Sequence, residues 1–258
     1  MQGLTIFSHS LRQVTGNLDG ALKVSALPYA VQFLSSAALL GPAAMAGQAD
    51  PAAAFSAEGG PSIVLVLLNL VITLVASIWI AVAWHRYILK NDAPTGFLPD
   101  FNGNRILAYF LRSLGIALLF IVLAIPLGIV AALIATPFFS VTGPNVVGML
   151  IIMVITYVPL AVLAYRLSTS LPAMALDEGG SFLAGWEATK GENGSIAVLA
   201  VVSVLLVFVG SAIGTFVLGN ALILSLAWAF AFNWLVMMVG VSILTTLYGH
   251  YIEKRALA

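Results

Sequence analysis

The chain has 258 residues, of which 61% are apolar and only 8% are charged. Because an ordinary soluble domain carries about 25% charged residues, this composition excludes a water-soluble fold. The net charge is zero, which argues against a nucleic-acid-binding protein. The absence of cysteine excludes a disulfide framework and a thiolate metal site.

Six stretches of the chain are long and apolar enough to cross a bilayer, whose hydrocarbon core of about 30 Å takes about 20 residues of helix. Each is free of charged residues. They run at 24–40, 62–84, 113–136, 146–165, 195–217 and 221–248. The sequence therefore predicts an all-α polytopic bundle of six transmembrane helices, in one integral membrane domain over residues 1–258.

Lysine and arginine are confined to four of the seven expected aqueous segments. They precede the first span, lie between the second and third and between the fourth and fifth, and follow the sixth. The basic residues are Arg12, Lys23, Arg86, Lys90, Arg105, Arg112, Arg166, Lys190, Lys254 and Arg255. By the positive-inside rule, we expect both termini in the cytoplasm.

The first span and the connection after it allow an alternative interpretation. Lys23, the apolar stretch and Ala44-Met45-Ala46 also fit a secretory signal with its cleavage motif, but residues 1–22 form an unusually long leader. We therefore favour a retained membrane helix. The connection at 41–61 is rich in Ala, Gly and Pro, so we expect no folded domain outside the membrane.

Apolar residues near the N-terminus recur at intervals of three and four: Leu4, Phe7, Leu11, Val14 and Leu18. This spacing places them on one face of a helix. It predicts a short amphipathic helix lying in the membrane interface. The alternative is a frayed N-terminal tail.

The ends of the second, fourth and sixth spans resemble one another. Arg86, Arg166 and His250 align there, each beside aromatic residues. The chain is thus a candidate for three parallel hairpin units. These units would span 1–90, 97–166 and 176–254. The alternative, which we favour, is that membrane helices commonly end in aromatic and basic residues whatever their ancestry.

Three amides fall inside the expected spans: Gln32, Asn69 and Asn233. Gly210 and Gly214 form a G-x-x-x-G, at which helices approach closely within a bundle or a dimer. We interpret both features as helix packing. The alternative is a facilitator or channel for a small neutral solute, gated by proline-bent helices. The prolines concerned are Pro28, Pro126 and Pro159.

Basic and aromatic residues gather at the expected cytoplasmic ends of the spans. Guanidinium groups bind phosphate through paired hydrogen bonds, and aromatic rings favour headgroup depth. The sequence therefore predicts a lipid-headgroup site, with membrane lipids, another membrane protein or a second copy as partners. The site residues are His85, Arg86, Arg105, Arg112, Arg166, Trp84 and Trp186. The alternative is that these residues only fix the topology.

We expect no catalytic residue, metal or cofactor. The chain contains no phosphate-binding loop, dinucleotide fingerprint, H-E-x-x-H or nucleophile elbow. A weaker alternative is an intramembrane lipid-modifying enzyme with His85 or His250 as its base. That activity requires a carboxylate within hydrogen-bond reach of the histidine and a cavity beside both.

One stretch of the chain combines Arg166, Leu171-Pro172-Ala173, Phe182, Trp186 and Thr189-Lys190-Gly191, followed by a new span. This pattern resembles that of a bacterial group that includes the membrane domain attached to some glycerophosphodiester phosphodiesterases and many six-helix inner-membrane proteins. The run Trp84-His85-Arg86-Tyr87-Ile88-Leu89 is similar to one in α-proteobacterial members. The resemblance covers a minority of the chain. It implies a bacterial inner membrane and a link to lipid or envelope physiology, but no hydrolase activity, because no soluble phosphodiesterase domain is attached.

Overall fold

The computed structural model describes residues 2–45, 61–94, 96, 98–142, 146–218 and 221–257. The protein is 84% helical, and the described ranges contain no strand. The prediction of an all-α fold is confirmed. The outer connection at 46–60 and Ala46 of the signal-peptide alternative lie outside the described residues.

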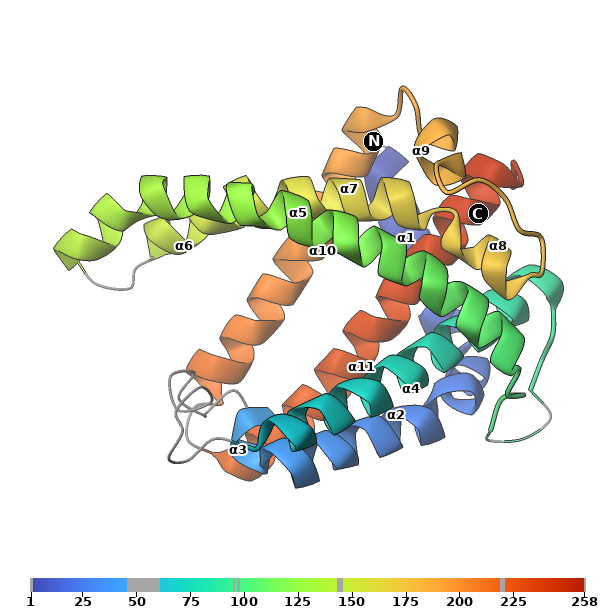
Figure 1. Ribbon diagram of the computed structural model, residues 1–258, viewed down its shortest axis with the longest axis horizontal. Coiled ribbons are helices and arrows are strands. Elements are labelled where there is room, and N and C mark those ends of the chain that lie inside the picture. The colour runs from blue at the N-terminus through green and yellow to red at the C-terminus, as the bar shows by residue number, and fades with distance from the viewer. Residues whose placement is uncertain are drawn as a thin grey trace. The chain divides into compact units, whose positions relative to one another are not determined.

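The elements of the described chain are all helices (Figure 1). In chain order they are α1 (Gln2–Gly16), α2 (Leu18–Leu40), α3 (Pro42–Met45), α4 (Ile63–Lys90), α5 (Gly103–Thr142), α6 (Val146–Ile152), η2 (Met153–Tyr157), α7 (Val158–Ser168), α8 (Leu171–Ala175), α9 (Ala184–Ala188), α10 (Asn193–Ala212), η3 (Ile213–Val217), α11 (Leu222–Leu247) and η4 (Tyr248–Ile252). The three η elements are π-helices that continue an α-helix.

Within the described residues, five helical segments are long and apolar enough to span a membrane. They are Ile63–Lys90, Gly103–Phe138, Leu150–Ala175, Asn193–Thr215 and Leu222–Ile252. These segments correspond to the second to sixth predicted spans. The first predicted span lies in α2, which is helical but is not among the five. Lys23, Pro28 and Gln32 lower the hydropathy of α2, and its role as a sixth span stays a prediction.

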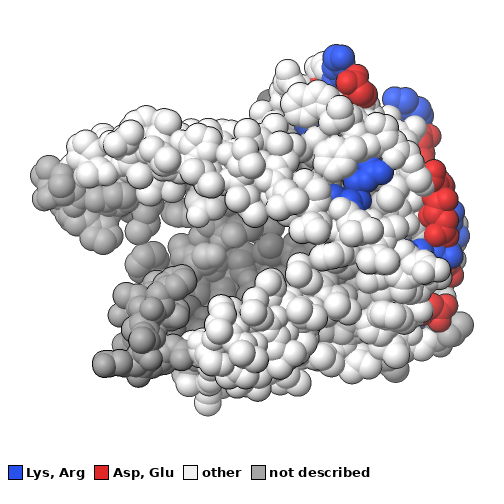
Figure 2. All heavy atoms as spheres, in the orientation of Figure 1, with Lys and Arg blue, Asp and Glu red and all other residues white. Residues whose placement is uncertain are grey.

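The longest helix is α5, whose 40 residues extend over about 60 Å at 1.5 Å per residue. It continues through Pro126, so the predicted bend there does not end the helix. In Figure 2 the described surface of α5 beyond Arg112 shows no basic or acidic side chain. Pro159 lies in the first turn of α7, directly after the π-helix η2.

The chain divides into two compact units. The first comprises Met1–Leu11, Leu107–Leu206 and Ile243–Ala258, and the second comprises Arg12–Ile106 and Val207–Ser242. Four helices, α1, α5, α10 and α11, continue from one unit into the other. Neither unit coincides with a predicted hairpin, and the threefold repeat stays a prediction.

In the second unit, α2 and α4 lie side by side and run in opposite directions (Figure 1). Ser36 Oγ on α2 donates to Asn69 Oδ1 on α4 at 2.8 Å. Ser77 Oγ on α4 donates to Gln32 Oε1 on α2 at 3.3 Å. Two of the three amides in the predicted spans therefore form hydrogen bonds between neighbouring helices.

The G-x-x-x-G also lies in the second unit, where α10 and η3 face α11. A Cβ atom at Gly210 would overlap the ring of Phe232, and one at Gly214 would lie 3.1 Å from Cδ1 of Trp228. The two rings are stacked, with centroids 5.4 Å apart. The two glycines thus provide space for aromatic rings of the same chain.

The N-terminal segment forms the predicted helix, α1, but it packs through a face of which the apolar spacing predicts only Val14. The buried residues on this face are Gly3, Ile6, Ser10 and Val14. Leu4 and Leu18 remain 43% and 48% exposed. The small residues at positions 3 and 10 allow close contact with other helices, whereas the leucines stay available to lipid. An interfacial position for α1 stays a prediction.

Candidate functional site

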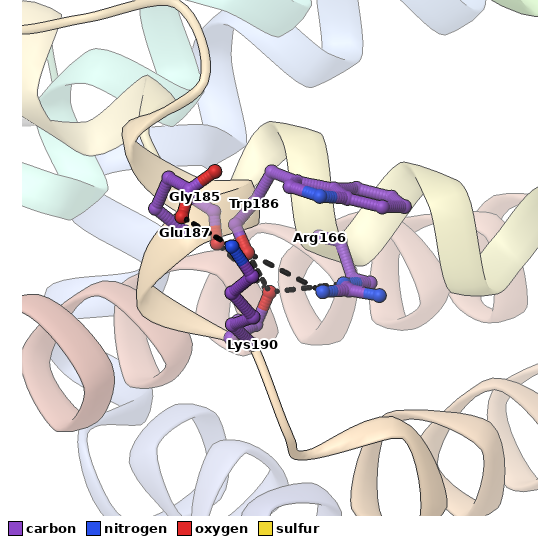
Figure 3. A network of polar contacts seen from close by, with 6 residues as sticks. Arg166, Gly185, Trp186, Glu187 and Lys190 are labelled. Atoms are coloured by element: carbon purple, nitrogen blue, oxygen red, sulfur yellow. Dashed lines mark hydrogen bonds and ion pairs between the residues drawn. The ribbon is translucent and has the colours of Figure 1, made fainter.

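Arg166 lies near the C-terminal end of α7 and is only 8% exposed. Its guanidinium carbon, Cζ, is 3.7 Å from the ring centroid of Trp186, which makes a cation–π contact. Nε donates to Thr189 Oγ1 at 3.2 Å, and Nη2 donates to the Trp186 carbonyl at 3.3 Å (Figure 3). Nη1 donates to Asn193 Oδ1 at 2.9 Å. The guanidinium is therefore fixed on one face by an aromatic ring and along its edges by three oxygen atoms.

The short helix α9 brings these groups to Arg166. A Cβ atom at Gly185 would lie 2.5 Å from the Arg166 carbonyl oxygen, so only glycine allows α9 to approach α7 this closely. Thr189 Oγ1 donates to the Gly185 carbonyl at 2.8 Å. In Figure 3 the Trp186 ring lies over the guanidinium group. Arg166, Trp186 and Thr189, which belong to the sequence pattern quoted above for residues 166–191, are thus in contact with one another.

The acceptors around Arg166 are all neutral. Across the described ranges, no carboxylate lies within ion-pair distance of it. A guanidinium group carries five N–H donors. Three of them donate as above, and the other two have no acceptor in the described part of the chain. A nearly buried charge without an ionic partner is costly, which makes this position a candidate anion site.

Arg112, on α5 of the same unit, is also held by neutral groups. Its Nη2 donates to the Gly180 carbonyl at 2.7 Å, and its Nη1 donates to the Ser181 carbonyl at 2.8 Å. Its Cζ lies 5.6 Å from the ring centroid of Phe182. The segment between α8 and α10 therefore orients two arginines without neutralising either of them.

Arg86 and Arg105 lie in the second unit and line one cavity of about 50 Å³. Asp92, Asp100 and Asn102 also line it. Arg86 Nη2 lies 2.7 Å from Asp92 Oδ2, and Arg86 Nε donates to the same oxygen at 2.8 Å. Carboxylates thus balance the positive charge of this cavity, whereas Arg166 and Arg112 of the first unit have neutral acceptors.

Trp84 and His85 are both 0% exposed. Ala81, Val82 and Leu89, which lie three or four residues from His85, are buried on the same face of α4. Neither Trp84 nor His85 lines the cavity beside Arg86. The structure thus groups the predicted site residues as Arg166 with Trp186 and Arg86 with Arg105, and it places Trp84 and His85 in the core.

Sequence reasoning did not identify the oxygen atoms that hold the arginines. Thr189 stands in the sequence pattern that carries the resemblance, so the sequence could have indicated it. Asn193 begins α10 after a turn at Gly191, and no regular spacing connects it to Thr189. The carbonyls of Gly180 and Ser181 carry no sequence signal, because every residue has a carbonyl group.

His250 lies in a polar network of the first unit. Its Nε2 lies 2.8 Å from Gln2 Nε2, and its Nδ1 lies 3.1 Å from the Arg255 carbonyl oxygen. Both ring nitrogens therefore have neutral neighbours. The nearby carboxylate of Glu192 instead accepts a hydrogen bond from Ser195 at 3.0 Å. In the described part of the chain, no carboxylate lies within hydrogen-bond distance of the His250 ring.

Within the residues that the structure describes, no three metal-ligating side chains gather at one point. No family model, curated protein or solved structure matches this chain. The candidate site therefore rests on the geometry of Arg166 with Trp186 and on that of Arg112, which lies in the same unit.

Proposed function

We propose that this chain is a non-enzymatic membrane protein that binds the phosphate of lipid headgroups through Arg166 and Arg112. The observation that carries this proposal is the Arg166 guanidinium, which is 8% exposed and has only neutral acceptors in the described part of the chain. Phosphate oxygens would supply the missing negative charge and accept the two remaining N–H groups. Arginine suits this role because its planar fork binds phosphate through two parallel hydrogen bonds.

The positions of both arginines along their helices favour a lipid over a free anion. Arg166 lies toward the C-terminal end of the apolar segment Leu150–Ala175, and Arg112 lies toward the N-terminal end of Gly103–Phe138. The rest of each apolar segment is free of lysine and arginine, except for Arg105 near the start of α5. Such helix ends lie at headgroup depth, where Trp186 would also be favoured.

The cellular location forms part of the same proposal. The distribution of basic residues supports cytoplasmic termini, and the resemblance of residues 166–191 supports a bacterial inner membrane. The headgroup site would then face the cytoplasmic leaflet, whose anionic lipids attract basic groups.

Native mass spectrometry of protein released from nanodiscs of phosphatidylglycerol and phosphatidylcholine tests the site. Arg166→Gln should lower the retention of phosphatidylglycerol about tenfold, because a charged hydrogen bond contributes about 1.5–3 kcal/mol. Lys190→Gln is the matched control. It removes the same charge from the same segment, but Lys190 is 71% exposed and already pairs with Glu187 at 3.2 Å. It should change retention less than about twofold.

A second substitution separates charge from geometry. Arg166→Lys keeps the charge but loses the planar fork, so we expect retention between those of the parent protein and Arg166→Gln. Equal retention in all variants would refute the proposal. Competition by inorganic phosphate, with no preference between the lipids, would identify the ligand as the free anion.

A further inference from the structure

A second polar cavity, in the second unit, lies between α10 with η3 and the N-terminal half of α11. Its volume is about 140 Å³. The described residues that line it come from the apolar segments Asn193–Thr215 and Leu222–Ile252 and from Met45 of α3, and none of them is charged. Its lining includes Ser211, Thr215, Asn233, Trp228 and Phe232.

Three polar side chains that line this cavity lack hydrogen bonds. Within the residues that the structure describes, Ser211, Thr215 and Asn233 make none through their side chains. Other serine hydroxyls on the same helices form hydrogen bonds. Ser203 Oγ on α10, for example, donates to the carbonyl four residues earlier at 2.8 Å. The side chains of Ser211, Thr215 and Asn233 are instead exposed, which leaves them open to an occupant of the cavity.

The depth of Asn233 makes this arrangement costly in a bilayer. It lies eleven residues beyond Leu222, or about 17 Å along α11, whereas the hydrocarbon core is about 30 Å thick. An amide surrounded by acyl chains finds no partner there, and each unsatisfied polar group costs several kcal/mol. An occupant that forms hydrogen bonds would remove this cost.

The lining defines the chemistry of the occupant. The described lining residues are all uncharged, which favours a neutral molecule, and hydroxyl and amide groups both donate and accept hydrogen bonds. The stacked rings of Trp228 and Phe232 supply a flat apolar wall beside Gly214. We infer that this cavity binds a small neutral polyol, independently of the lipid site proposed above.

Fluorine NMR in nanodiscs tests the inference, with 5-fluorotryptophan in the full chain and the Trp228 resonance assigned by its loss in Trp228→Phe. Added glycerol should shift this resonance in a saturable manner, whereas glycerol 3-phosphate should not. Asn233→Leu should raise the glycerol concentration at half-saturation about tenfold, because it removes the amide partner.

Thr73→Val is the matched control. The Thr73 hydroxyl on α4 is buried, has no hydrogen-bond partner and does not line the cavity, and valine has nearly the same shape. This variant should respond to glycerol as the parent protein does. The inference would be overturned by a shift that does not saturate, by an equal response to glycerol 3-phosphate, or by equal responses of the parent protein and Asn233→Leu.

Discussion

Gly3 of α1 lies against the main chain of α10 at Ser195. A Cβ atom at position 3 would overlap the Ser195 carbonyl oxygen and lie 2.9 Å from the Leu199 amide nitrogen. The N-terminal helix is thus docked through direct backbone contact, for which glycine is required.

Gly3→Ala should therefore destabilise the protein by about 1–3 kcal/mol, because α1 must move away from α10 to admit the methyl group. Thermal unfolding in detergent, followed by loss of soluble monodisperse protein, measures the effect. Gly16→Ala is the control, since no atom lies within 4 Å of a Cβ atom at that position of the same helix. Equal melting temperatures for the two variants would contradict the packing described.

The hydrogen bond from Ser36 to Asn69 should couple α2 to α4 energetically. A double-mutant cycle with Ser36→Ala and Asn69→Ala should give a coupling energy of about 0.6 kcal/mol, and at most about 2 kcal/mol. Reversible unfolding in mixed micelles provides the four free energies of unfolding. Pairing Asn69→Ala with Ser203→Ala, on another helix, provides a cycle that should show no coupling. A coupling energy of zero in both cycles would contradict an energetic coupling between α2 and α4.

The absence of cysteine makes the topology directly measurable. Asp50→Cys and Asp100→Cys should react with an impermeant maleimide from opposite sides of membrane vesicles, because the second predicted span separates them. Residue 100 should label from the cytoplasmic side. Labelling of both positions from one side would contradict the predicted order of spans.

Arg86→Gln should affect anionic-lipid retention much less than Arg166→Gln. Asp92 already neutralises Arg86 through an ion pair at 2.7 Å, whereas no described carboxylate pairs with Arg166. We expect a change below about twofold in the same mass-spectrometric measurement. If the Arg86 variant lost as much lipid as the Arg166 variant, the proposed difference between the ion-paired Arg86 and Arg166 in lipid binding would be wrong.

The apolar spans could be predicted because length and freedom from charge are properties of the sequence itself. The face through which α1 packs could not be predicted from hydropathy. Gly3 and Ser10 are buried while Leu4 is exposed, because contacts between membrane helices select small residues rather than the most apolar ones.

The candidate site was predictable only in part. The composition of the Arg166 to Gly191 stretch indicated a cation beside an aromatic ring, and the structure places Trp186 on Arg166. Which arginines have carboxylate partners depends on tertiary structure, so the contrast between Arg86 and Arg166 could not be predicted. The burial of His85 could have been recognised from its helical spacing to Val82 and Leu89, both apolar.

The length of α5 has a consequence for the surrounding lipid. From Ser113 to Thr142 the helix carries no charge and extends over about 45 Å, compared with a typical hydrocarbon thickness of about 30 Å. Membrane helices usually tilt by about 20° and rarely by more than about 40°, so tilting alone does not absorb the excess. Either the bilayer thickens locally around this helix or its uncharged tip emerges from the opposite leaflet. Lipid chain length therefore becomes a determinant of its conformation.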